Sequence, residues 1–203
     1  MKIDNLLTMK GVFIHKGVKL PDVTLSSGDV LWIQTENNLQ ADLFTSFMLG
    51  LFEPKVGKAV LAGTDIRDAK GTVSYIDISR WNPRIDSVET FIKLLAYDGG
   101  FQISSVINEF RKILDGMDSG YILNMSFEEM SVSTKNIIST AISLSMPKLI
   151  IILLEPFAGL DKKAISFIGG EIKKIVLDGS SFIILSDSEP PVYSKHVKME
   201  PIS

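Results

Sequence analysis

Two short apolar runs in the C-terminal third constrain the fold more than any other feature. They are LIIILL at residues 149–154 and FIIL at residues 182–185. Each is far shorter than the roughly 20 apolar residues of a membrane-spanning helix. Unbroken runs of this length are typical of strands buried on both faces of a parallel sheet. Apolar residues recur at helical spacing between them, through Lys162–Leu177, so the sequence predicts an α/β core.

The rest of the chain divides into a strand-rich first part and a helix-rich middle. Apolar runs separated by glycines indicate short strands and hairpin turns before residue 77. Strands are predicted at residues 12–14, 23–25, 30–33, 59–61 and 73–76, and further helices at 43–52, 88–97, 103–114 and 132–144. We therefore expect one domain, residues 1–203, with a small antiparallel β-subdomain and a helical subdomain inserted at about residues 86–140.

Composition excludes several classes of function. The net charge is −3, so no positive field favours a nucleic-acid partner. The chain has no cysteine, and its two histidines, His15 and His196, are far apart without carboxylates at ligand spacing, so we expect no metal site. The N-terminus lacks the apolar core of a signal peptide. The expected location is cytoplasmic, without direct membrane insertion.

The segment around the first apolar run carries a specific pattern. Residues 147–168 read PKLIIILLEPFAGLDKKAISFI, with Glu155-Pro156 directly after the run. This resembles the Walker B strand, catalytic glutamate and D-loop (PKLLILDEPTAGLD) of the nucleotide-binding domain of ATP-binding-cassette (ABC) transporters. The segments at 50–66, 73–91, 130–148 and 182–189 resemble other parts of that domain in order. The resemblance implies a P-loop NTPase core over nearly the whole chain.

The resemblance also implies surfaces for partners. The D-loop lies at the dimer interface in the family, and the docking surface for the permease lies near the Q-loop. The corresponding D-loop residues here are Ala158, Gly159, Leu160 and Asp161, and the corresponding docking residues are Tyr75, Trp81, Pro83 and Ile85.

The phosphate-binding loop departs from the family pattern. The family's GENGAGKST aligns with residues 35–43, and the nucleotide-binding positions become Thr35, Glu36, Asn37, Asn38, Leu39, Gln40, Ala41 and Asp42. A P-loop needs glycines that let N–H groups converge on phosphate, a lysine, and a hydroxyl for magnesium. Ala41 replaces the lysine and Asp42 the hydroxyl. A carboxylate about 4 Å from phosphate costs roughly 4 kcal/mol at an effective dielectric of 20. We expect Asp42 to cap the following helix, and binding of ATP and magnesium to be lost.

The other motifs have lost their chemistry as well. Leu154 stands at the Walker B aspartate, and the switch histidine aligns with Ser188 or Asp187. The Q-loop glutamine falls near Ile78 or Asp77, and the adenine-stacking aromatic falls near His15. The signature LSGGQ corresponds to Met130, Ser131, Val132, Ser133 and Thr134.

Glu155 survives as a vestigial catalytic position, but it cannot act as a base without a positioned phosphate and metal. Each surviving residue also has a purely structural interpretation. Glu155 can form a hydrogen bond at the end of its strand, Asp161 and Ser131 can cap helices, and Trp32 can belong to the core.

These features predict a catalytically inactive ABC-like subunit that needs no cofactor. It would form a heteromer with an active ABC ATPase and dock a transmembrane permease at the inner or plasma membrane. Two alternatives stay open. One is a weakly active ATPase that contributes to one composite site through its signature region, and the other is a stand-alone regulatory or binding module.

Overall fold

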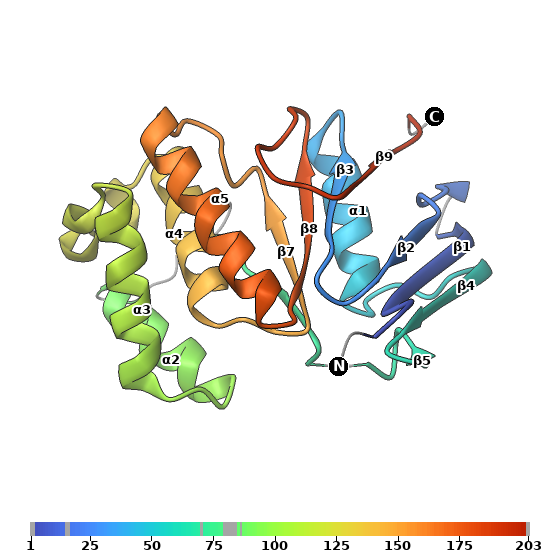
Figure 1. The fold of residues 1–203 in the computed structure, drawn as a ribbon, viewed down its shortest axis with the longest axis horizontal. Coiled ribbons are helices and arrows are strands. Elements are labelled where there is room, and N and C mark those ends of the chain that lie inside the picture. The colour runs from blue at the N-terminus through green and yellow to red at the C-terminus, as the bar shows by residue number, and fades with distance from the viewer. Residues whose placement is uncertain (1–2, 15–16, 70, 79–84, 86, 202–203) are drawn as a thin grey trace. The chain divides into compact units, whose positions relative to one another are not determined.

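The computed structural model describes residues 3–14, 17–69, 71–78, 85 and 87–201. These residues form two compact units, and Figure 1 labels their elements. Unit 1 takes residues 1–75, 148–155 and 173–203, and unit 2 takes residues 76–147 and 156–172. The chain therefore leaves and re-enters unit 1 twice.

A five-stranded parallel sheet forms the centre of unit 1. Its order is β6-β7-β8-β3-β9, and every neighbouring pair is parallel. The strands are β3 (Val30–Gln34), β6 (Val73–Tyr75), β7 (Ile150–Leu154), β8 (Ser181–Ser186) and β9 (Lys195–Lys198). The two apolar runs of the sequence are β7 and β8, next to each other and buried, as their composition predicts. The predicted parallel α/β core is confirmed.

The strand β9 was missed by the sequence analysis, which placed the last strand at residues 182–185. Its sequence is KHVK, and its side chains are alternately half-buried and exposed. No apolar run marks such a strand, because it lies at the edge of the sheet that the described residues form, beside β3. The segment at residues 187–194 returns the chain from the end of β8, and β9 then runs parallel to β3.

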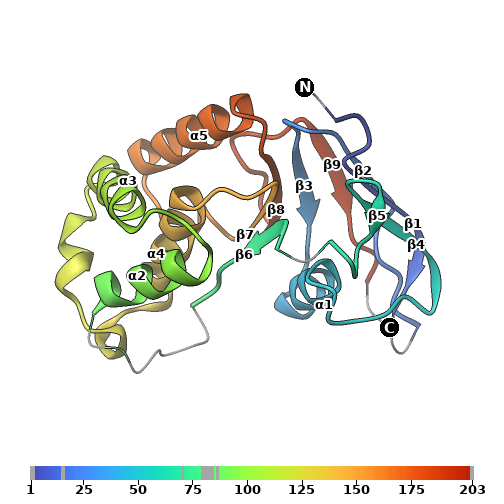
Figure 2. The same ribbon diagram turned by 90° about the horizontal axis from the view of Figure 1, so that it is seen from below.

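A second, antiparallel sheet completes unit 1. Its order is β2-β1-β4-β5, formed by β1 (Leu7–Phe13), β2 (Val23–Leu25), β4 (Val56–Leu61) and β5 (Thr64–Asp65). Both sheets and the helix α1 (Asn38–Met48) share one hydrophobic core. Phe44 and Phe47 of α1 are fully buried there. The predicted antiparallel β-subdomain is thus present (Figures 1 and 2).

Unit 2 is helical in its described residues. It contains α2 (Val88–Asp98), α3 (Ile103–Gly116), α4 (Val132–Ser145), the 3-10 turns η2 (Gly120–Asn124) and η3 (Phe127–Glu129), and the first part of α5 (Lys162–Leu177). The helix α5 has the predicted bounds and continues through the Gly169-Gly170 pair. Within the residues that the structure describes, none of the helices has the length and apolarity needed to cross a membrane.

Candidate functional site

The carboxyl ends of β3, β7 and β8 meet at one edge of the parallel sheet in unit 1. Register brings Gln34 beside Ser186, and Leu154 beside Leu185. Ligands of open α/β sheets bind outside this edge. The segments that leave these strands therefore form the candidate site: residues 35–37, Glu155, and residues 187–188.

The loop after β3 is shorter than the sequence analysis predicted. The helix α1 begins at Asn38, not at residue 43, so residues 39–42 lie in its first turns. Asn37 is the N-cap, and its side chain accepts the backbone N–H of Gln40 at 3.0 Å. Asn is a strongly preferred N-cap. The expectation that Asp42 caps this helix was wrong, because Asn37 already occupies that role.

Gln40 fills the loop from the side of the helix. Its side chain is fully buried, although it is polar. Its Oε1 accepts the backbone N–H of Glu36 at 2.6 Å, and its Nε2 donates to the carbonyl of Glu200 at 3.0 Å. The N–H of Thr35 donates to the carbonyl of Ser186 at 3.1 Å. The N–H groups of Thr35, Glu36 and Gln40 thus have protein acceptors, whereas in a P-loop such groups converge on an anion.

Neither residue at the lysine and hydroxyl positions extends from the loop. Ala41 is 1% exposed and belongs to the hydrophobic core. Asp42 lies half-buried in the second turn of α1. The loop itself carries the carboxylate of Glu36, which forms an ion pair with Lys198 of β9 at 3.0 Å.

Glu155 connects the ends of β7 and β8. It follows β7 in a left-handed backbone conformation with φ of 44°, which costs a non-glycine residue about 1–2 kcal/mol. Its N–H donates to the carbonyl of Leu185, and its Oε1 accepts the N–H of Asp187, both at 2.9 Å. The structural role that the sequence left open for Glu155 is therefore present.

Burial raises the pKa of the Glu155 carboxyl above its ordinary value of 4.5. The Asp187 carboxylate adds to this effect, while the hydrogen bond from the Asp187 N–H opposes it. The folded state therefore binds more protons than the unfolded state between pH 4.5 and the raised pKa of the folded state. The stability that this group contributes is lost as pH rises through this range.

Replacement of Glu155 by Gln should remove this loss, because the amide is neutral and its oxygen still accepts the Asp187 N–H. We expect the free energy of unfolding of Glu155→Gln, relative to wild type, to increase between pH 4.5 and pH 7. Urea denaturation at both pH values measures it. Glu128→Gln, which changes an exposed carboxylate in η3, is the control. A difference between Glu155→Gln and wild type that is independent of pH would contradict the assignment.

The positions aligned with the switch histidine follow β8. Asp187 and Ser188 are both exposed, and the Ser188 hydroxyl donates to the Asp187 carboxylate at 2.6 Å. The imidazole of His196, in β9, stacks on Trp32 with ring centroids 4.0 Å apart. Trp32 is buried, as expected, and its indole N–H donates to the Ser186 carbonyl at 3.2 Å. The sequence did not indicate the contact of His196 with Trp32, because only the parallel pairing of β9 with β3 brings the two residues together.

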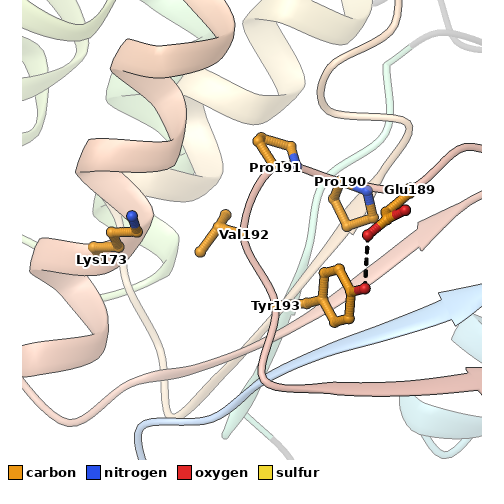
Figure 3. A pocket seen from close by; sticks show the side chains of 6 residues that line it. All are labelled: Lys173, Glu189, Pro190, Pro191, Val192 and Tyr193. Atoms are coloured by element: carbon orange, nitrogen blue, oxygen red, sulfur yellow. Dashed lines mark hydrogen bonds between the residues drawn. The ribbon is translucent and has the colours of Figure 1, made fainter.

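A pocket of about 500 Å³ lies beside the segment that connects β8 to β9 (Figure 3). Lys173 projects from α5, and the other lining residues are Glu189, Pro190, Pro191, Val192 and Tyr193. The Tyr193 hydroxyl donates to Glu189 at 2.7 Å, and this hydrogen bond raises the pKa of Tyr193. None of the site residues predicted from the sequence lines this pocket.

The residues aligned with the signature and the D-loop lie in unit 2. Ser131 caps α4, and its hydroxyl accepts the N–H of Thr134 at 3.1 Å. The Asp161 carboxylate accepts the N–H of Ala164 at 2.8 Å at the start of α5. Both residues therefore have the capping roles that the sequence suggested.

Gly159 of the aligned D-loop also lies close to Ser133 in the first turn of α4. A Cβ on Gly159 would come 3.3 Å from the hydroxyl of Ser133. Met130 is buried and Val132 is 63% exposed, so the apolar side chain at the first glycine of the aligned signature points to solvent.

The predicted docking residues are only partly described. Tyr75 and Ile85 are half-buried, whereas Trp81 and Pro83 lie outside the described residues. His15, at the aligned adenine-stacking position, lies outside them as well. At the aligned Q-loop position, Ile78 is buried and its N–H donates to the hydroxyl of Ser139 at 3.0 Å. Among the described residues, no group of three or more His, Asp or Glu side chains is placed to hold a metal ion.

No family model and no curated protein matches this sequence. Solved structures do match it. One is a protein from Pyrococcus furiosus, provisionally described as an ABC-transporter ATP-binding protein, with 20% identity and a TM-score of 0.75 over 98% of each chain. An ATP-binding subunit of an ABC transporter matches with 19% identity and a TM-score of 0.73, over 89% of this chain and 79% of its own.

A third match is cbiO1 from Clostridium perfringens, described as part of the ABC transporter complex cbiONQ. It has 17% identity and a TM-score of 0.67, over 91% of this chain and 79% of its own. The coverage includes both units, and the β-subdomain, parallel sheet and helical unit agree with the order expected from the sequence. This chain has the fold of the ATP-binding cassettes of ABC transporters.

Proposed function

We propose that this protein is a nucleotide-free member of the ABC cassette family, and that it serves as a non-catalytic subunit of a membrane transport complex. One observation carries the proposal. The cassette fold is kept over the whole described chain, while the loop after β3 is closed by its own hydrogen bonds through Gln40. A cassette that cannot hold phosphate has no use for Glu155 as a base.

The proposed partners are inferred from the complex to which one structural neighbour belongs. The structural neighbours include part of an ABC transporter complex. This chain would occupy a cytoplasmic position beside a permease, with an active ABC ATPase as the second cassette. A contribution of Ser131 to a composite site in the partner is less favoured, because its hydroxyl already caps α4 within this chain.

Isothermal titration of the purified chain with Mg-ATP should give no saturable binding at micromolar concentrations. The reason is that Ala41 supplies no lysine at the position aligned with the P-loop lysine, and three N–H groups of the loop segment already have acceptors. An active ABC cassette titrated in the same buffer serves as the positive control. Saturable binding at micromolar ATP would overturn the nucleotide-free assignment.

The assembly is tested by purification from detergent-solubilised membranes with a tag on this chain. We expect a polytopic membrane protein and a second cassette with an intact lysine-containing P-loop to co-elute with it. Recovery of this chain as a lone monomer, from both the soluble and the membrane fraction, would count against the transport complex and favour a stand-alone module.

A further inference from the structure

The segment after β9, together with the last residue of that strand (residues 198–200), contacts the loop after β3. The N–H of Met199 donates to the carbonyl of Gln34 at 3.0 Å, and Met199 is 1% exposed. The carbonyl of the next residue, Glu200, accepts the Gln40 amide at 3.0 Å. An ion pair between Lys198 and Glu36 adds to this contact, and a second ion pair joins Glu200 to Lys19 outside the loop. The segment is therefore attached to the loop by both backbone and side-chain contacts.

Gln40 is the one buried polar side chain among these hydrogen-bonding partners. Its carboxamide offers an oxygen to the Glu36 N–H on one side and an N–H to the Glu200 carbonyl on the other. These two contacts join parts of the chain that are 160 residues apart. A buried amide group without hydrogen-bond partners is strongly unfavourable, so the Gln40 side chain needs both the Glu36 N–H and the Glu200 carbonyl.

The ion pairs do not account for the attachment. Lys19 and Glu200 have side chains that are 39% and 66% exposed, and Lys198 and Glu36 are similarly exposed. Surface pairs of this kind contribute little to stability. The buried hydrogen bonds of Gln40 and the buried side chain of Met199 remain as the contacts that hold the segment.

We propose that Gln40 is a two-ended latch, which makes the loop after β3 and the segment after β9 open and close together. The Glu36 N–H, which would have to be free to receive an anion, stays occupied while the segment is in place. Release of the segment removes one of the two partners of Gln40 and loosens its hold on Glu36. The latch depends only on contacts within unit 1 and is independent of the proposed transport complex.

Residue-resolved amide hydrogen exchange on the full chain, measured by NMR, tests the coupling from both ends. Gln40→Met keeps the volume but removes both hydrogen bonds, so exchange should accelerate about fivefold or more at Glu36 and at residues 198–200. Met199→Ala loosens the segment alone, and it should accelerate exchange at Glu36 as well. Lys19→Ala removes only an exposed ion pair of the same segment, so it should leave Glu36 unchanged.

Two results would overturn the latch. One is a protected Glu36 amide in Met199→Ala while residues 198–200 exchange faster, since the two segments would then open separately. The other is an equal acceleration in both units for Gln40→Met, measured against the amides of α3, because that is general destabilisation rather than local coupling.

Discussion

Replacement of Ala41 by lysine should lower the free energy of unfolding by about 4 kcal/mol or more, and should not create an ATP site. The side chain of Ala41 is 1% exposed and faces the core shared by α1 and both sheets. Full burial lowers the pKa of a lysine by up to about 3–5 units, and each unit corresponds to about 1.4 kcal/mol. The lysine would also overfill a packed interior.

Leu39→Lys is the matched control, because it places the same charge two positions earlier in α1 at a side chain that is 55% exposed. It should change the free energy of unfolding by less than about 0.5 kcal/mol, as surface substitutions usually do. Urea denaturation compares the two variants, and titration with Mg-ATP accompanies it. If Ala41→Lys were as stable as Leu39→Lys and bound Mg-ATP, residue 41 would face the loop and the closed loop would be wrong.

The sequence predicted best where burial on both faces leaves a continuous apolar signal. The strands β7 and β8 and the helix α5 were placed within a residue or two, because each has its own local pattern. The start of α1 was misplaced for the opposite reason. Its first turn mixes polar Asn38 and Gln40 with apolar Leu39 and Ala41, so no clear apolar periodicity marks the start of the helix, and the alignment to a P-loop extended the loop. Asn37 was the available signal, since Asn is a preferred N-cap.

The hydrogen bonds that close the candidate site could not be predicted from local sequence patterns. Gln40 is a polar residue in a polar stretch, and its partner Glu200 is 160 residues away. The strand β9, which brings Glu200 to the loop, has no apolar run. Ala41 and Asp42 at the aligned lysine and hydroxyl positions could be read from the sequence, but the contacts of Gln40 depend on pairing between distant segments.

Gly57 is a position where the sequence indicates a hairpin turn, but it lies inside β4, where β4 meets a register shift of β1. Its φ is +86°, and a Cβ there would come 2.2 Å from the carbonyl oxygen of Gly11. Gly57→Ala should therefore lower the free energy of unfolding by about 3 kcal/mol or more. A left-handed backbone costs alanine about 1–2 kcal/mol, and overpacking adds about 1–3 kcal/mol.

Gly63→Ala separates these two causes. Gly63 has almost the same backbone conformation, with φ of +83°, but no atom lies within 4 Å of the position that an alanine methyl group would take there. It should lose only the conformational part, about 1–2 kcal/mol. Urea denaturation at equal m-value gives both differences. Because the clash at Gly57 is with backbone rather than with a movable side chain, equal losses for the two variants would mean that β1 and β4 do not approach this closely.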